Sequence, residues 1–195
     1  MRSATASLAR SVRIALAAAS ISSGSILAAH ATENPCEPEI VRAAEHYRIP
    51  IGILYAVGLA ETGRKGTLQP NALNIEGKAL FPASPSAAVT AVEQARRGGA
   101  TLIDVGCMQI NQHYHGDRFD SLRDMLDPKQ NVDYAARFLV TLKGRHDSWS
   151  MAVARYHAGP DNNPAQKAYV CRVIANMVAS GFGRWTANAR KFCNS

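Results

Sequence analysis

A single carboxyl residue, Glu61, follows a segment of almost entirely apolar residues, Ile51 to Ala60. Pro50 suits the first position of a helix and Gly63 suits the left-handed residue that ends one, so we expect a helix over residues 50–63. A helix that is apolar on every side is a buried helix. Burial raises the pKa of a carboxyl group toward neutrality, as a general acid requires. The alternative is that Glu61 lies just beyond the buried part and reaches solvent.

Three short segments hold most of the residues suited to chemistry: Ala60–Gly63 (AETG), Val105–Asn111 (VGCMQIN) and Arg155–Gly159 (RYHAG). In this order and spacing the chain resembles the soluble lytic murein transglycosylases, lysozyme-like enzymes that cut the glycan strands of peptidoglycan. The family pattern is Glu-Ser after an apolar helix, then Gly-Leu-Met-Gln-Ile, then Ala-Tyr-Asn-Ala-Gly. The resemblance covers about residues 38–160, with a helix start at Asp127-Pro128 between the last two segments.

The resemblance implies an α+β, mainly helical, lysozyme-like single domain with a small β-hairpin between helices. It implies that Glu61 is the sole catalytic acid and base, acting on the β-1,4 bond between N-acetylmuramic acid and N-acetylglucosamine. Glu61 first protonates the glycosidic oxygen, while the sugar's acetamide helps to stabilise the cation. It then deprotonates the C6 hydroxyl, which attacks to give a 1,6-anhydro end without a cofactor.

The resemblance also implies a set of substrate contacts. Met108 and Gln109 are expected to line the groove beside the scissile bond, and Tyr156 to place its hydroxyl near the Glu61 carboxyl. His157 belongs to the same motif, and Asn74 is a further candidate sugar contact. Taken alone, Tyr156 and Met108 are also typical of ordinary core packing.

Four positions depart from the family pattern: Thr62 stands for Ser, Cys107 for Leu, Arg155 for Ala and His157 for Asn. None of them changes the carboxylate, so they bear on the binding of individual sugars rather than on the reaction. His157 replaces an amide, which both donates and accepts hydrogen bonds, with an imidazole that does both when it is neutral.

Two further carboxylates raise an alternative, because glycoside hydrolysis usually needs a pair of carboxyl groups flanking the bond. Glu76 lies in the expected hairpin turn and Asp104 in a later apolar segment. Either of them facing Glu61 across a groove would favour a lysozyme-type hydrolase, although Glu76 beside Gly77 is also typical of a solvated turn. A third interpretation is a wall-binding scaffold subunit that has kept the groove but not the activity.

The elements that must position these residues follow from periodicity and from turn residues. We expect helices over residues 38–47 (burying Ile40, Val41 and Ala44), 50–63, 86–97 (closed by Gly98-Gly99) and 166–179. Another helix is expected to begin at Asp127-Pro128 and to end at Gly144. A further helix is expected to begin at Ser148 and to stop at Gly159-Pro160. The expected hairpin pairs residues 72–75 with 78–81, and residues 101–111 form a compact apolar segment.

The first 31 residues have the composition of a leader. Arg2, Arg10 and Arg13 precede an apolar run, Ile14 to Ala29, and Ala29-His30-Ala31 offers small residues for cleavage. We therefore expect a signal peptide over residues 1–31, a periplasmic catalytic domain over residues 32–195 and no stable membrane span after cleavage. The alternative is an uncleaved anchor.

Without residues 1–31, which hold three arginines and no acid, the formal charge falls from +7 to +4. The remaining basic residues are scattered, so no nucleic-acid-binding stripe is expected. The expected partner is the peptidoglycan glycan strand. Small exported members of the family often serve envelope-spanning machines, which extends the expected partners to a type IV or type III secretion, conjugation or pilus apparatus.

Four cysteines, Cys36, Cys107, Cys171 and Cys193, lie after the leader, which favours disulfides in an exported protein. We favour Cys171–Cys193, a link that ties the polar tail to the last helix. Cys36 then pairs with Cys107, or Cys107 stays a buried free thiol. A metal site of Cys107, His113 and His115 is not expected, because the spacing lacks a fourth ligand.

Overall fold

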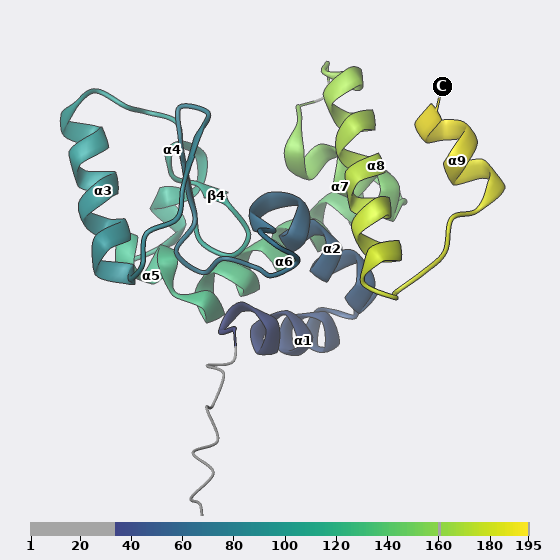
Figure 1. Ribbon diagram of the computed structural model, residues 1–195, viewed down its shortest axis with the longest axis horizontal. Coiled ribbons are helices and arrows are strands. Elements are labelled where there is room, and N and C mark those ends of the chain that lie inside the picture. Colours follow the sequence, from purple (N-terminus) through teal and green to yellow (C-terminus); the bar gives the residue numbers. More distant parts are fainter. Residues whose placement is uncertain (1–33, 160, 195) are drawn as a thin grey trace, which may run out of the picture. The chain divides into compact units, whose positions relative to one another are not determined.

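The computed structural model describes residues 34–159 and 161–194. These residues form mostly helices, with a small antiparallel sheet at one side, next to α3 and α4 (Figure 1). In chain order the elements are α1 (Cys36–Tyr47), α2 (Ile51–Thr62), β1 (Leu73–Ile75), β2 (Lys78–Leu80), α3 (Pro85–Arg97), β3 (Ile103–Val105), β4 (Ile110–Asn111), α4 (Gln112–His115), a 3₁₀ turn (Gly116–Arg118), α5 (Leu122–Leu126), α6 (Pro128–His146), α7 (Trp149–His157), α8 (Asn163–Ala179) and α9 (Ala187–Asn194). The predicted mainly helical α+β fold is confirmed.

The expected leader, residues 1–31, lies outside the described residues. Within the described ranges, no helix has both the length and the apolar character needed to cross a membrane.

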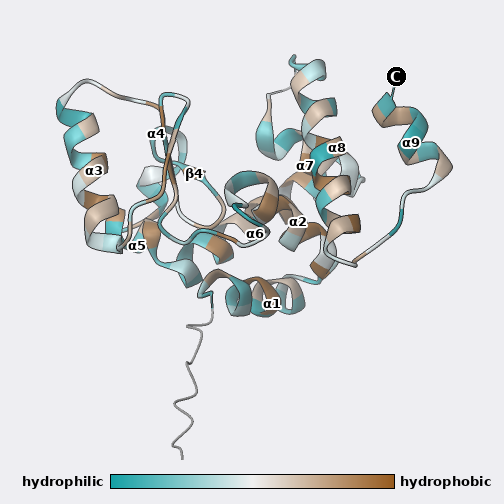
Figure 2. Ribbon diagram, in the orientation of Figure 1, coloured by the Kyte–Doolittle hydropathy of each residue, from teal (hydrophilic) through white to brown (hydrophobic). Residues whose placement is uncertain are grey.

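Helix α2 packs against both α1 and α8 and carries the apolar centre of the helical part. Much of this helix is brown, the colour of hydrophobic residues, in Figure 2. Its ends differ from the sequence prediction. Pro50 precedes the helix instead of starting it, and Gly63 is not left-handed, since its φ is −57°. Glycine is required there by space, because a Cβ atom at Gly63 would collide with the carbonyl oxygen of Leu59.

The predicted hairpin is confirmed, with β1 and β2 paired antiparallel around Glu76-Gly77. It belongs to a four-stranded sheet of order β2-β1-β3-β4, which the sequence analysis did not predict, because residues 101–111 read only as a compact apolar segment. The Glu76 carboxylate accepts hydrogen bonds from the backbone N–H groups of Thr101 (2.8 Å) and Leu102 (3.0 Å). These bonds lower the pKa of Glu76 and fasten the hairpin turn to the start of β3.

Within the described residues, side-chain caps fix the starts of six helices, α3 to α8, three of which bear on the sequence prediction. Ser84 accepts a hydrogen bond from the Ala87 N–H at the start of α3, and Ser148 accepts one from Met151 at the start of α7. Asp127 does the same for α6, with Pro128 in its first turn, as predicted.

Three other expectations about the helices were wrong. Helix α6 does not end at Gly144 but continues to His146, and the left-handed residue after it is Asp147 (φ 51°), a residue type that tolerates this conformation. Val41, which was expected to be buried in α1, is 43% exposed. The polar tail was assigned no element, yet residues 187–194 form α9.

Two disulfides cross-link the described residues. Cys171–Cys193 joins α8 to α9 as favoured, and Cys36–Cys107 joins α1 to the turn between β3 and β4. The alternative of a free thiol at Cys107 is therefore wrong. Two disulfides fit a protein that folds in an oxidising compartment outside the cytoplasm.

Candidate active site

A cavity of about 380 Å³ opens between the end of α2, the sheet and the helices α6, α7 and α8. Its polar lining comes from α2, β1, β3, β4, α4, α7 and α8 and from the turn between β3 and β4. The lining residues are Ala60, Glu61, Asn74, Asp104, Gln109, Ile110, Asn111, Tyr114, His115, Phe138, Tyr156, His157 and Arg172. Five of the six predicted site residues, all except Met108, therefore line one cavity.

Glu61 is enclosed at the floor of this cavity, since its side chain is only 13% exposed. Burial raises the pKa of Glu61 to about 7, and the neighbouring Asp104 carboxylate acts in the same direction. The hydrogen bond from Tyr169 and the charge of Arg172 oppose this rise without cancelling it. The alternative in which Glu61 reaches solvent is thus wrong, and near neutral pH the group can both donate and accept a proton.

Tyr169, on α8, donates a hydrogen bond from its hydroxyl to Oε1 of Glu61 at 2.5 Å. The Tyr169 side chain is fully buried and its ring stacks on His157, with centroids 4.2 Å apart. Tyr169 was not among the predicted site residues, and it lies 108 positions from Glu61 in the sequence. The available signal was a tyrosine on the buried side of α8, because a buried tyrosine hydroxyl needs a partner.

His157, at the end of α7, lies with Nδ1 3.9 Å from Oε1 of Glu61. Burial lowers the pKa of His157, with a further contribution from Arg172, so the imidazole is neutral at pH 7. A neutral imidazole at the mouth of the cavity both donates and accepts hydrogen bonds, as sugar hydroxyls and acetamides require.

Tyr156 and Met108 differ from the expected arrangement. The Tyr156 hydroxyl donates its hydrogen bond to the carbonyl oxygen of Met108 at 2.8 Å, and Tyr169 takes the position against the Glu61 carboxyl. The Met108 side chain is fully buried next to Gly58, so it is not part of the cavity lining. Met108 therefore supports the site from beneath, while the ring of Tyr156 lines it.

Gln109 lines the cavity from a strained backbone position, with φ at 48°. Its side-chain Nε2 donates to the carbonyl oxygens of Ala72 (3.0 Å) and Gly106 (3.2 Å). Gln109 thereby ties the turn between β3 and β4 to the start of β1 as well as facing the cavity.

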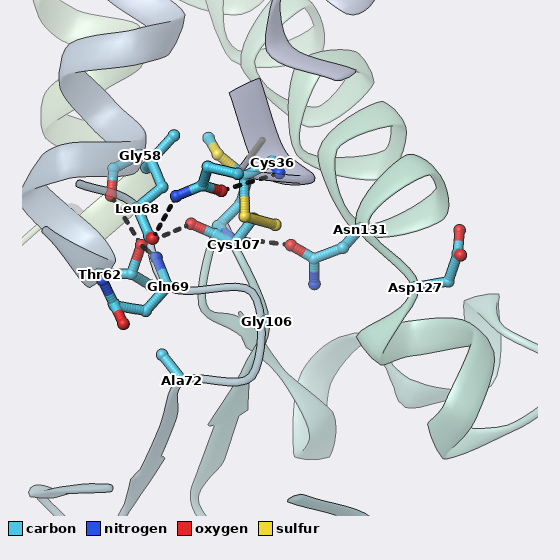
Figure 3. Close-up of a disulfide and its surroundings, with 12 residues drawn as sticks. Cys36, Gly58, Thr62, Leu68, Gln69, Ala72, Gly106, Cys107, Asp127 and Asn131 are labelled. Atoms are coloured by element: carbon cyan, nitrogen blue, oxygen red, sulfur yellow. Dashed lines mark hydrogen bonds between the residues drawn. A yellow bond between two sulfur atoms is a disulfide. The ribbon is translucent and has the colours of Figure 1, made fainter. Parts of the chain in front are cut away.

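The turn at residues 105–108 is held from beneath by the buried side chain of Asn131, in the first turn of α6 (Figure 3). Its Oδ1 accepts from the Met108 N–H at 2.8 Å, and its Nδ2 donates to the carbonyls of Val105 (3.0 Å) and Met125 (2.8 Å). Gly106 has φ at +78°, and a Cβ there would lie 2.5 Å from Nδ2 of Asn131. Glycine at this position is thus required by both conformation and space.

Thr62 and the Cys36–Cys107 disulfide hold the other side of this turn (Figure 3). The Thr62 hydroxyl lies 3.0 Å from the carbonyl oxygen of Cys107 and 3.2 Å from that of Gly58, both acceptors. It also accepts a hydrogen bond from the Gln69 N–H at 3.3 Å. A hydroxyl at this position therefore couples the end of α2, next to Glu61, to the turn that precedes Gln109, and threonine provides it as serine would.

Asn74 and Asp104 face the cavity from paired positions of β1 and β3. Oδ1 of Asn74 is buried and has no hydrogen-bond partner within the described part of the chain, so it is available to accept a bond from a ligand. Asp104 accepts a hydrogen bond from Nδ2 of Asn111 at 2.7 Å, and burial raises the pKa of Asp104. Glu76, in contrast, is not among the cavity residues.

Replacing Tyr169 with Phe is expected to raise the pKa of Glu61 above 7, because the hydroxyl stabilises the ionised carboxylate. With Glu61 as the general acid that the sequence analysis predicts, the alkaline limb of the pH profile of kcat/KM should move to higher pH by about one unit. Tyr156→Phe is the matched control, since its hydroxyl bonds a backbone carbonyl instead. A limb that moves down, or by the same amount in both variants, would contradict this role of Tyr169.

No group of three or more His, Cys, Asp or Glu side chains within residues 34–159 and 161–194 is arranged to hold a metal ion. The sulfur of Cys107, considered above beside His113 and His115, is bonded to Cys36.

A family model described as the transglycosylase SLT domain matches residues 39–174. This range includes Glu61, Tyr169 and every residue that lines the cavity. Comparison with curated proteins and comparison with solved structures gave no match.

Proposed function

The chain belongs to the transglycosylase SLT domain family of peptidoglycan lytic transglycosylases, and on this basis we propose that Glu61 alone cleaves the bond between N-acetylmuramic acid and N-acetylglucosamine without water. The main support for the proposal is the enclosed carboxyl group of Glu61, which has a pKa of about 7 and accepts a hydrogen bond from a tyrosine at the floor of a polar cavity. Near neutral pH such a group is protonated in part of the population and ionised in the rest, so its pKa suits both the donation and the acceptance of a proton.

In the first step, protonated Glu61 gives its proton to the bridging oxygen, and the bond from the muramic acid C1 to that oxygen breaks. Tyr169 stabilises the carboxylate that remains, through the bond to Oε1. The sugar's own 2-acetamido oxygen shields the cation at C1. In the second step, Glu61 takes the proton of the C6 hydroxyl, and that oxygen attacks C1. The proton is returned to Glu61 and no water is consumed, so the product ends in 1,6-anhydro-muramic acid.

We assign the substrate contacts to the remaining polar lining. Asn74 Oδ1, buried and unpaired within the described residues, suits the N–H of an acetamide group. His157 and Gln109 lie at the same cavity, each with hydrogen-bonding capacity toward sugar hydroxyls. Tyr114, which is 67% exposed at the rim, offers an aromatic face on which a pyranose ring can stack.

A lysozyme-type hydrolase is the second candidate, and one observation favours it: Asp104 lines the same cavity as Glu61. In a one-carboxylate enzyme, Asp104→Asn should lower cleavage of isolated sacculi by less than about tenfold, against at least about a hundredfold for Glu61→Gln. Glu76→Gln should have a smaller effect still, because the Glu76 carboxylate serves the turn to β3.

Mass spectrometry of the muropeptides decides between the two reactions. Anhydro ends are lighter than hydrolysed ends by one water, and the wild-type protein should release the anhydro form. Reducing muramic ends, lost together with activity in a folded Asp104→Asn protein, would support the hydrolase instead. Failure of the purified wild-type protein to cut sacculi at all would favour a wall-binding scaffold.

We also propose that the protein works in the periplasm and opens the wall locally for a secretion, conjugation or pilus apparatus. The two disulfides and the family's wall substrate support the location. The role beside an apparatus rests on the resemblance to small exported members alone. A chromosomal Glu61→Gln substitution should then reduce transfer or secretion while leaving growth and cell shape unchanged; altered growth with normal transfer would point to general wall turnover.

A further inference from the structure

A second cavity, of about 640 Å³, lies between α7, α8 and α9, which follow one another along the chain. Its walls are mainly apolar and include Met151 and Ala154 of α7, Val170 and Ile174 of α8, and Ala189 and Phe192 of α9. Met151 and Phe192 remain 37% and 45% exposed at its edges. We call this cavity the C-terminal cleft.

Arg155 lies among these apolar walls. Its Nε and Nη1 atoms are buried, and neither has a hydrogen-bond partner anywhere in residues 34–159 or 161–194. Buried donors of a charged group carry a substantial desolvation penalty unless they are paired. The guanidinium is therefore suited to a ligand that brings an oxygen acceptor, above all a carboxylate.

The electrostatic surroundings favour the same kind of ligand. From Asp161 to Ser195 the sequence contains five basic residues, Lys167, Arg172, Arg184, Arg190 and Lys191, and one acid, Asp161. Arg172 faces the catalytic cavity, and the other four basic residues still outnumber the acid, so an anionic group approaching the C-terminal cleft meets net attraction from this segment.

The third wall of the cleft lies outside the part of the chain shared with the family. The family match ends at residue 174, whereas α9 begins at Ala187 and is fastened to α8 by Cys171–Cys193. The lining residues of the cleft and of the catalytic cavity do not overlap, although Arg155 directly precedes Tyr156 and His157. Both cavities can therefore be occupied at once, and the cleft is an addition to the catalytic unit.

We propose that the C-terminal cleft docks a short acidic segment of a partner protein, with a carboxylate on Arg155 and apolar side chains between Met151 and Phe192. A protein segment is favoured over the wall's own peptides because α9 lies beyond the region that the family shares for acting on the wall. Docking there holds the enzyme beside its partner while the catalytic cavity stays open to glycan.

The test uses the oxidised full chain and a fluorescein-labelled probe peptide of sequence LEFELE, acetylated at its N-terminus, with LQFQLQ as the uncharged control. Fluorescence polarisation should show the acidic probe binding at least about tenfold more tightly than the control peptide. Arg155→Ala, which places the residue of the family pattern at this position, should remove most of that difference. Ala189→Trp, which fills the cleft without changing charge, should weaken binding of both peptides.

Arg123→Ala is the matched control, because it removes one exposed positive charge from α5, away from the cleft; it should change affinity by less than about twofold. Equal affinity for the two peptides, or wild-type binding by both cleft variants, overturns the proposal. A competition experiment gives a further outcome that overturns the proposal. If the peptidoglycan stem tetrapeptide displaces the labelled probe at a lower concentration than the unlabelled probe does, the cleft is a substrate subsite. Binding is measured without any cleavage, so this outcome is independent of the catalytic assignment.

Discussion

Replacing Glu61 with Gln is expected to abolish glycan cleavage and, at the same time, to make the folded protein more stable at alkaline pH. Gln matches the size of Glu and can still accept the hydrogen bond from Tyr169, but it cannot donate the catalytic proton. Loss of general acid and base catalysis should lower the rate on sacculi by at least about a hundredfold.

The gain in stability follows from the raised pKa. Folding carries Glu61 from an ordinary pKa near 4.5 to about 7, so the native state keeps its proton where the unfolded state has lost it. The stability that this proton provides is fully present below pH 4.5 and is lost as the pH rises through 7. At pH 8 the enclosed carboxylate therefore costs about 3 kcal/mol, which the Gln variant avoids.

Urea unfolding of both proteins at pH 4 and pH 8, with disulfides intact, measures this effect. The variant should be the more stable at pH 8 by up to about 3 kcal/mol, and the two should converge at pH 4. Glu93→Gln, at an exposed position of α3, is the matched control and should change neither activity nor the pH dependence. Near-normal turnover by Glu61→Gln would refute the assignment, and equal stability at both pH values would refute the enclosed carboxylate.

The sequence was sufficient to place Glu61 because its environment is local. The ten apolar residues before it predict a buried helix, and Glu61 is the first charged residue after them. Helix starts were likewise readable where a capping side chain and a proline adjoin, as at Asp127-Pro128. Helix ends were harder to predict: Gly63 is not left-handed as expected, and the helix expected to end at Gly144 continues to His146.

The partners of Glu61 were not readable in the same way. Tyr169 reaches Oε1 from a helix more than a hundred residues away, and nothing in its own neighbourhood distinguishes it from a core tyrosine. Tyr156, which the motif indicated, lines the cavity, but its hydroxyl donates its hydrogen bond to the carbonyl oxygen of Met108. The strands β3 and β4 are only three and two residues long, too short for alternation to reveal them.

The contacts of Asn131 were likewise not predicted from the sequence. Its replacement by Ala is expected to lower the stability of the fold more than any other single polar-to-apolar change near the site. The substitution leaves the Met108 N–H and the Val105 and Met125 carbonyls without their side-chain partner in the interior. Each such loss costs on the order of 1–3 kcal/mol, so we expect the free energy of unfolding to fall by about 3–5 kcal/mol in total once the turn relaxes.

Activity should fall with it, because Gln109 lies directly after Met108 and its strained backbone depends on the turn beneath it. Urea unfolding with disulfides intact gives the stability. Gln130→Ala is the control: it removes an exposed side chain that donates to Asp124 and keeps the backbone N–H that donates to Asp127, so it should cost less than about 0.5 kcal/mol. Asn131→Asp separates the contributions: it keeps an acceptor for the Met108 N–H but offers no donor to the two carbonyls, and it buries a charge. We expect this variant to be no more stable than Asn131→Ala. An Asn131→Ala protein within about 1 kcal/mol of wild type would mean that the disulfide and Thr62 hold the turn without Asn131.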